Sequence, residues 1–192
     1  MGNRLILITT LAAYQTRFWL KVGLRLQQQG EQVMVLSFDD RSCELLAASG
    51  LPYVNIPEAA RRSTVVDAAA VFQQFALSDL NYWTSHHRIT YGIGDAAELD
   101  DRLARYLGAV DQVLADLLAQ RRATDVVVVQ ELGGFLSVLA TWFAARNRSL
   151  THYFLEPSFF RGRLFSLKNV LTAPQIPDQP ESAVSPTVRA YL

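Results

Sequence analysis

The chain has 192 residues, half of them hydrophobic, so it can bury a core of its own without disulfides or structural metals. Its 18 basic and 18 acidic residues give a formal net charge of zero, which argues against a nucleic-acid partner, because such binding needs concentrated positive charge. A single cysteine, Cys43, excludes an internal disulfide, and no apolar run is long enough to span a bilayer. We expect a cytoplasmic protein with at most peripheral membrane association.

The first 56 residues alternate between buried strands and helices. Three runs rich in β-branched residues and leucine are typical of strands buried on both faces. Between the first two runs, Phe18, Val22 and Leu26 recur at helical spacing with Trp19 beside them, and Gly30 ends that helix. Ser42 is a candidate cap for a shorter helix before the third run. The predicted strands are residues 4–9, 32–38 and 51–56, and the short helix is 43–49.

The middle of the chain has a weaker pattern. Residues 65–77 favour a helix, whereas residues 81–93 are rich in aromatic side chains and histidine and are expected to loop over the sheet. Residues 97–122 then predict a long helix, because leucine and valine recur along one face.

The last part returns to the alternating pattern. A strand at 125–130, a helix at 135–146 and a strand at 151–155 follow one another with short connections. Proline and polar residues dominate from 172 to 186, which is typical of a linker. The sequence therefore predicts an α/β, Rossmann-like doubly wound parallel sheet over residues 1–171, followed by a proline-rich linker at 172–192.

In open parallel sheets, ligands bind beyond the carboxyl ends of the strands. The turn after the first strand, residues 10–16, contains no glycine, so it cannot bring backbone close to a pyrophosphate. This argues against a dinucleotide dehydrogenase or a P-loop ATPase. Tyr14 and Gln15, with Arg17 beside them, could instead contact a hydroxyl-rich or anionic ligand, or they could form an ordinary polar turn.

Three carboxylates stand where strands end. Asp39 occupies the position of a ribose-binding carboxylate, but without a glycine fingerprint a helix-capping role is favoured. Glu131 follows the strand at 125–130, and Gly133 and Gly134 would let a ligand reach the next helix. For Glu131, a ligand contact and a capping carboxylate are equally good interpretations.

Glu156 is the candidate catalytic residue. It ends a strand and precedes a proline, and partial burial there would raise its pKa toward the range that general acid–base catalysis needs. Ser158, Arg161 and Arg163 follow, and the two arginines could hold an anionic sugar or a phosphate. The alternative is a glutamate–arginine salt bridge that fixes the loop.

Other chemistries have little support. His86 and His87 are adjacent, so their side chains point in different directions, and Cys43 has no companion at metal-ligand spacing. We therefore predict no metal site and no bound cofactor. The nucleophile motif Gly-x-Ser-x-Gly is also absent from the sequence.

The chain resembles the amino-terminal half of GT-B glycosyltransferases over about 170 residues. The resemblance rests on the order of strands and helices up to Pro57, and on the strand at 125–130 with Glu131, the glycine pair and an alanine-rich helix. The segment 153–165, with Asn169, is similar to capsule polysaccharide biosynthesis proteins, which include retaining β-Kdo transferases that use CMP-Kdo.

This resemblance implies an acceptor-binding half of an enzyme that transfers a sugar, with Kdo as a candidate, from a nucleotide sugar to a bacterial surface polysaccharide. It implies that Glu156 matches a glutamate important for catalysis. It also implies a second Rossmann-like domain, in the same chain or in a partner subunit, that carries most of the donor site. The alternative is a non-catalytic Rossmann-like module that binds a partner.

Overall fold

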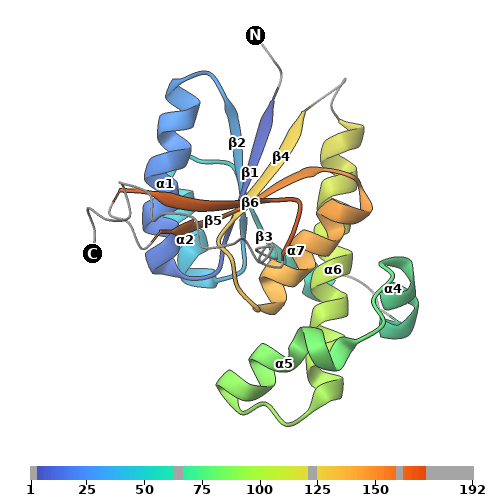
Figure 1. The fold of residues 1–192 in the computed structure, drawn as a ribbon. Helices are drawn as coiled ribbons and strands as arrows, with labels where there is room; N and C mark the ends of the chain where they lie inside the picture. The colour runs from blue at the N-terminus through green and yellow to red at the C-terminus, as the bar shows by residue number, and fades with distance from the viewer. Residues whose placement is uncertain (1–3, 63–66, 121–124, 159–161, 172–192) are drawn as a thin grey trace, which may run out of the picture.

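The computed structural model describes residues 4–62, 67–120, 125–158 and 162–171. Its centre is a six-stranded sheet in the order β3-β2-β1-β4-β5-β6 (Figure 1). The first five strands are parallel to their neighbours, and β6 runs antiparallel to β5. The strands are β1 Leu5–Thr10, β2 Gln32–Ser37, β3 Tyr53–Asn55, β4 Val126–Gln130, β5 Thr151–Pro157 and β6 Leu164–Lys168.

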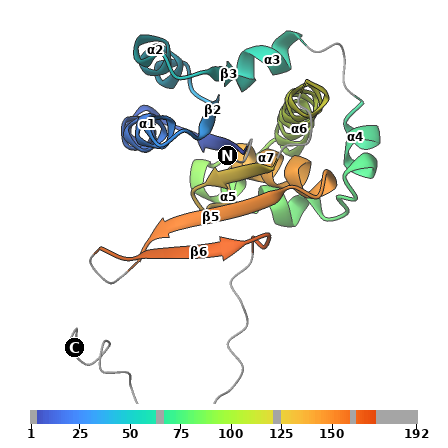
Figure 2. The same cartoon turned by 90° about the horizontal axis from the view of Figure 1, so that it is seen from above.

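Helices cover both faces of this sheet. Helices α1 and α2 lie on one face, while α6 and α7 lie on the other (Figure 2). The bounds are α1 Ala13–Gln28, α2 Asp40–Ser49, α3 Ile56–Arg62, α4 Ala68–Gln74, α5 Leu80–Tyr91, α6 Ala96–Ala119 and α7 Leu136–Asn147. The prediction of an α/β, Rossmann-like doubly wound sheet is confirmed, with one antiparallel edge strand added.

The apolar side chains form two clusters, one on each face of the sheet. The larger cluster packs α6 and α7 against the sheet and includes the fully buried Val128 and Phe143. The smaller cluster centres on Trp19 and Val35 beneath α1 and α2. Burial on both faces is the reason that β1, β2 and β4 each contain a run of four or more consecutive apolar residues.

The expectation of a loop at 81–93 is wrong, because residues 80–91 form helix α5. The side chain of Asp79 caps its first turn by accepting a hydrogen bond from the Tyr82 N–H at 3.1 Å, and Gly92 ends it in the left-handed conformation. These two end signals favour a helix even where no apolar stripe is evident. Helix α5 and the start of α6 form a lobe that projects from one end of the sheet (Figure 1).

Three boundaries near the N-terminus also differ from the prediction. Helix α2 is capped by Asp39, which accepts hydrogen bonds from both the backbone N–H and the hydroxyl of Ser42, each at 2.9 Å, so Ser42 is not the cap. The strand predicted at 51–56 is shorter in the structure, where β3 covers only residues 53–55. It passes directly into α3, a helix that was not predicted. Pro57 therefore lies in a first helical turn, where its missing N–H is tolerated.

The buried face of α1 is rotated from the expected one. Trp19 and Gly23 are buried, whereas Phe18 is 55% exposed. A Cβ added at Gly23 would lie 3.0 Å from a methyl group of Leu51, so a larger residue there would require the Leu51 side chain to shift. The Trp19 indole N–H donates to Glu131, the residue directly after β4, and this hydrogen bond also holds the Trp19 face of α1 against the sheet.

Strand β6 was not predicted. It pairs with β5 through the hairpin that follows Pro157, and Asn169 closes the pair by exchanging hydrogen bonds with the backbone of His152. The predicted linker at 172–192 lies outside the described residues. No helix in the described ranges is long and apolar enough to cross a membrane.

Candidate functional site

A pocket opens at the point where the strand order reverses, between the carboxyl ends of β1 and β4. Chain order runs outward from β1 through β2 and β3, then continues on the other side with β4. Such switch points are the usual ligand sites of open parallel sheets. The pocket has a volume of about 330 Å³. Its lining residues are Leu11, Ala12, Tyr14, Gln15, Phe38, His87, Tyr91, Arg102, Tyr106, Phe135, Leu136 and Ser137. We call it the switch-point pocket.

Aromatic side chains form much of its wall. Phe38 and Tyr106 meet edge to face with ring centroids 5.2 Å apart, and His87 lies 5.4 Å from Tyr91. Tyr14 is 71% exposed at the rim. Rings that present an apolar face and a polar edge suit a ligand that carries both C–H and O–H groups.

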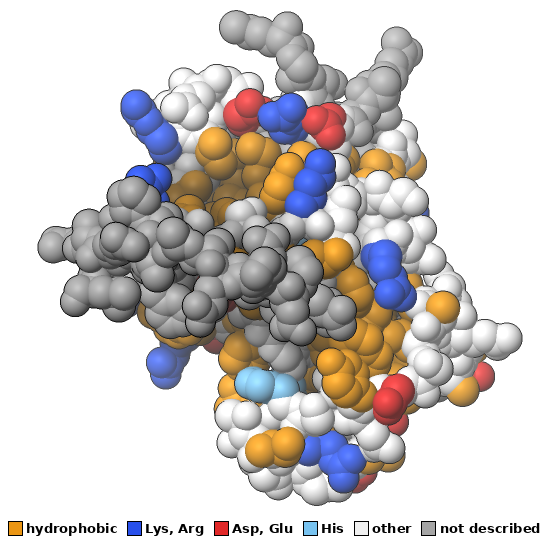
Figure 3. Space-filling model, in the orientation of Figure 1, with side chains coloured by type: hydrophobic (Ala, Val, Ile, Leu, Met, Phe, Trp, Pro, Cys, Tyr) orange, Lys and Arg blue, Asp and Glu red, His pale blue; other side chains and the backbone are white. Residues whose placement is uncertain are grey.

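His87 is the main titratable group inside this pocket. Burial lowers its pKa below the usual histidine value, and the nearby His86 and Arg102 act in the same direction, while a hydrogen bond with the Gly134 backbone opposes them. The imidazole is therefore neutral near pH 7 and can donate or accept one hydrogen bond. Figure 3 shows histidine beside hydrophobic side chains where the α5 lobe meets the body of the domain.

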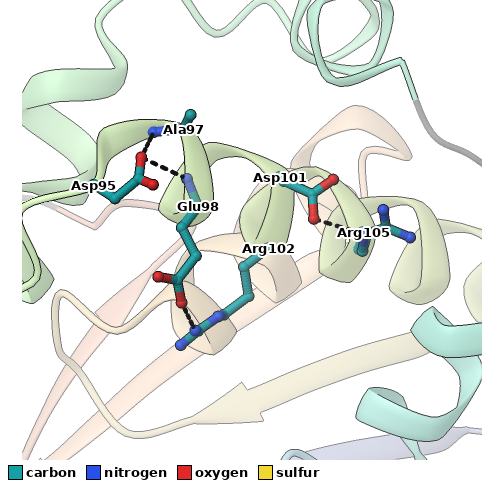
Figure 4. A network of polar contacts seen from close by, with 6 residues as sticks. All are labelled: Asp95, Ala97, Glu98, Asp101, Arg102 and Arg105. Atoms are coloured by element: carbon teal, nitrogen blue, oxygen red, sulfur yellow. Dashed lines mark hydrogen bonds and ion pairs between the residues drawn. The ribbon is translucent and has the colours of Figure 1, made fainter.

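Arg102 supplies the positive charge of the pocket. It projects from the second turn of α6, where Glu98 is its ion-pair partner one turn earlier, whereas Asp101 pairs with Arg105 (Figure 4). The Arg102 side chain remains 42% exposed, so the pair is screened by water. The pocket consequently combines a partly neutralised cation with neutral donors, which suits a polar ligand of low charge.

Tyr106 completes the polar groups. Burial raises the pKa of its hydroxyl above the usual tyrosine value, so the side chain keeps its proton and can donate a hydrogen bond.

Gln15 connects this pocket to the acidic rim of the sheet. Its side-chain oxygen accepts from the Leu11 N–H at 3.0 Å, and its amide nitrogen donates to Glu131 at 2.7 Å. The other Glu131 oxygen accepts from the Trp19 indole at 2.9 Å. Glu131 is thus held in one orientation by two donors from α1. Gln15 has only its second amide N–H left to donate to a ligand in the pocket.

Glu131 and Glu156 come from the neighbouring strands β4 and β5, at the edge of the sheet where the sequence placed both residues. Burial raises the pKa of Glu156 above the usual carboxyl value, and the negative charge of Glu131 adds to this rise, whereas a hydrogen bond with the Leu132 backbone opposes it. The two carboxylates have different partners: each Glu131 oxygen accepts a hydrogen bond from a side chain of α1, whereas the charged form of Glu156 is disfavoured by burial.

Gly133 and Gly134 lie in the turn between Glu131 and α7. A Cβ at Gly133 would meet the Phe135 ring at 3.0 Å, and one at Gly134 would lie 2.6 Å from the Cβ of His86. Gly134 therefore lets α5 pack against the turn, a structural role that the prediction of ligand access did not include. Gly133 lines a neighbouring cavity of about 260 Å³ rather than the switch-point pocket.

The remaining predicted residues belong to the β5–β6 hairpin. The Ser158 N–H donates to the Arg163 carbonyl at 3.0 Å, so these two residues face each other across the hairpin. Arg163 is exposed. Arg161 lies outside the described residues. The structure thus places Tyr14 and Gln15 in the wall of one pocket and joins Glu131 to Gln15 by a hydrogen bond. Glu156 lies on the strand next to β4, and this strand continues into the hairpin.

The sequence prediction did not include His87, Tyr91, Arg102 and Tyr106 as ligand contacts. The first two were considered only as part of a metal site or a loop, and the last two lie on a helix whose apolar stripe alone was interpreted. Within the described ranges, no three His, Cys, Asp or Glu side chains are grouped closely enough to hold a metal ion.

The sequence and the structure were compared with those of known proteins. No protein-family model and no curated protein matches the sequence. Among solved structures, MurG from Acinetobacter baumannii is similar, with a TM-score of 0.45 and 16% sequence identity. The match covers 78% of this chain and 33% of that protein, so the chain spans about one third of its length. The chemistry of the site has to follow from the residues of this chain.

Proposed function

We propose that this chain is the acceptor-binding half of a GT-B glycosyltransferase. The observation that carries the proposal is Glu156, a carboxyl group of raised pKa within the electrostatic influence of Glu131. Glu131 is in turn hydrogen-bonded to Gln15, which lines the pocket with aromatic walls. A sugar hydroxyl bound in the switch-point pocket could reach this pair through the rim that Gln15 and Glu131 form. The sequence resemblance to GT-B amino-terminal halves supports the same function.

In the proposed reaction, an acceptor hydroxyl oxygen forms a bond to the anomeric carbon of the donor sugar. The bond between that carbon and the donor phosphate breaks, and the nucleotide leaves with the bonding electrons. Glu156 accepts the hydroxyl proton or positions the hydroxyl, and its raised pKa makes it a better base than an ordinary carboxylate. A second domain supplies most of the nucleotide-sugar site, and retaining stereochemistry would need a further nucleophile or equivalent group from that domain.

The finer proposal concerns the sugar. The segment from Tyr153 to Phe165 resembles capsule polysaccharide biosynthesis proteins, so Kdo from CMP-Kdo is the first donor to test, with a bacterial surface polysaccharide as acceptor. Arg163, exposed on the hairpin, and Arg161 are the proposed contacts for acidic groups of such a sugar.

The test uses the full-length protein, a panel of nucleotide sugars that includes CMP-Kdo, and glycan acceptors. We expect Glu156→Gln to lower transfer by about 100-fold or more, the usual contribution of a general base, and the exposed Glu44→Gln to leave it unchanged. Full activity of a folded Glu156→Gln variant would remove Glu156 from the chemistry. Transfer from another nucleotide sugar but not from CMP-Kdo would refute the finer proposal alone.

A second candidate function is a non-catalytic binding module. It is favoured by the commitment of Gln15 and Glu131 to each other and to Trp19, which leaves fewer groups for a substrate. The two candidates differ in one measurable way: the enzyme half should bind a glycan acceptor in the switch-point pocket, and Tyr106→Phe and Arg102→Gln should weaken that binding. A module that binds only another protein would show no glycan binding.

A further inference from the structure

The N-terminus of α7 is an uncapped helix end that borders the switch-point pocket. No side chain in the described ranges caps this helix. Its first three N–H groups, those of Leu136, Ser137 and Val138, have no hydrogen-bond partner in the part of the chain that the structure describes. Leu136 and Ser137 both line the pocket. N–H groups at a helix end that lack a protein partner normally meet water or a ligand.

The Ser137 side chain is a second and independent sign of a ligand. The residue is 8% exposed, and its hydroxyl makes no hydrogen bond within the described ranges, although its carbonyl accepts from the Thr141 hydroxyl at 2.9 Å. The hydroxyls of Thr9 and Thr10 also lack partners there, but solvent cannot reach them. The Ser137 hydroxyl is not enclosed in this way, so a molecule in the pocket can meet it. A buried hydroxyl of this kind normally has a partner.

Two further sources of positive potential converge on the pocket. Helix α1 begins at its wall next to Ala12, and the described residues provide no side-chain cap for this helix either. The Leu11 N–H already has Gln15 as its partner, so α7 offers the freer helix end. Arg102 adds a guanidinium, and none of the described lining residues is acidic. Its partner Glu98 stands outside the lining, and both side chains are about half exposed (Figure 4), so the pair leaves part of the charge for a ligand. Two helix ends and one partly paired arginine favour a single negative charge.

The other walls of the pocket suit a sugar ring. Phe38, Tyr106 and Phe135 contribute aromatic rings, which pack well against the C–H face of a sugar. Burial raises the pKa of Tyr106, so its hydroxyl keeps its proton and can donate to a sugar oxygen. The volume of about 330 Å³ is at the lower end for ligand pockets. It fits one sugar unit better than a longer stretch of glycan.

We propose that the acceptor unit in the switch-point pocket is a sugar with one carboxylate, bound through that group at the N-terminus of α7. One carboxylate oxygen would accept from N–H groups of the first turn, and the Ser137 hydroxyl and Arg102 would donate to the other. A phosphate monoester carries about two negative charges at neutral pH, more than one partly paired arginine balances. The inference rests on the proposed function, from which it takes the sugar, and it adds the acidic class of the acceptor.

The test compares sugars that differ only at the sixth carbon. Methyl glucuronide, methyl glucoside and methyl glucoside 6-phosphate, and the corresponding galactose series, are added to the isotope-labelled full-length protein, and the amide NMR signals of Leu136 and Ser137 are followed. We expect a uronide of at least one series to bind about tenfold or more tightly than its neutral counterpart, because it gains charge-assisted hydrogen bonds. Equal affinity of acid and neutral sugar, or tighter binding of the phosphate, would overturn the proposal. So would the absence of any shift at these two amides with either uronide up to tens of millimolar.

Variants locate the carboxylate. Ser137→Ala and Arg102→Gln should each weaken uronide binding about tenfold and change the affinity for the neutral sugar less. Ser137→Asp places a fixed carboxylate at the same helix end, where it favours the helix, and should abolish uronide binding in a chain whose amide spectrum shows that it is folded. The matched controls are Ser85→Ala, whose hydroxyl lies outside this pocket, and the exposed Arg25→Gln, and both should bind like the wild type. Unchanged uronide affinity in both Ser137 variants would contradict the proposal.

Transfer assays separate this inference from the proposed function. A protein that transfers a sugar to a neutral acceptor and binds neither uronide would overturn the inference and leave the proposed function standing. A protein that binds a uronide at Leu136 and Ser137 but transfers none of the nucleotide sugars would support the acidic-sugar site and count against the transfer reaction.

Discussion

Replacement of Gly134 by alanine tests whether the α5 lobe depends on one close contact. The added Cβ would lie 2.6 Å from the Cβ and 2.9 Å from the Cγ of His86. Because both are atoms near the helix backbone, rotation of a side chain cannot relieve the clash. Helix α5 would have to retreat by roughly 1 Å to restore an ordinary carbon–carbon contact. The contact of His86 with Phe135, at 4.9 Å between ring centroids, would loosen with it.

Overpacking of this kind costs about 1–3 kcal/mol of unfolding free energy. For a domain of this size, the melting temperature should fall by about 2–4 °C for each kcal/mol. The measurement is urea denaturation together with hydrogen exchange, which should show lost protection in α5 first. Gly108→Ala is the matched control, since nothing lies within 4 Å of the added Cβ. Alanine in that helix interior should stabilise the chain by about 1 kcal/mol.

Two results would refute this reasoning. One is a Gly134→Ala variant with the unfolding free energy of the wild type and unchanged protection of α5. The other is a loss of stability in Gly108→Ala equal to that in Gly134→Ala, which would point to a general sensitivity of glycine positions and not to the contact with His86.

Three further predictions concern individual side chains. Asp79→Ala removes the cap of α5 and should cost about 1 kcal/mol, with faster hydrogen exchange confined to that helix; uniform change across the chain would contradict a local role. Glu131→Ala leaves the Gln15 amide and the Trp19 indole without their acceptor and should lower the unfolding free energy by about 1–3 kcal/mol in urea denaturation, more than Glu131→Gln does. Burial lowers the pKa of His152 from 6.5 to about 3 on folding, so its contribution to stability is complete above pH 6.5 and is lost as the pH decreases toward 3. His152→Phe should flatten that part of the stability profile, and identical profiles would show that His152 does not titrate as described.

The sheet could be predicted because its strands are buried on both faces, which leaves a continuous apolar run as their signature. The run at Val126 is the clearest case, and the structure places it in the centre of the sheet. The position of Glu131 and Glu156 at one edge followed from the same reasoning, since parallel strands end on the same side. That the two residues follow neighbouring strands is a consequence of the strand order, which the structure adds.

The rest of the site depends on contacts between distant parts of the chain. Gln15 and Glu131 are separated by 116 positions, and no local pattern indicates that they share a hydrogen bond. Helix α5 lacks an apolar stripe because its buried contacts come from aromatic and histidine side chains on several sides. A segment of this composition was therefore expected to be a loop. Asp79 and Gly92, a cap residue and a left-handed terminator, were the available signals for its two ends. His87 and Arg102 meet only because this helix folds back onto α6.

The link between Gln15 and the backbone of Leu11 also bears on how this sheet could change its ligand over evolution. In phosphate-binding relatives of the fold, free amide groups at the first turn face the anion. Here the Leu11 amide is already occupied by a side chain of the same chain, and that side chain is anchored to Glu131. Acquiring a dinucleotide would require the loss of Gln15, a new partner for Glu131 and glycines in the turn, all together. Each step alone would lower stability before any affinity was gained, which makes the first turn resistant to drift toward nucleotide binding.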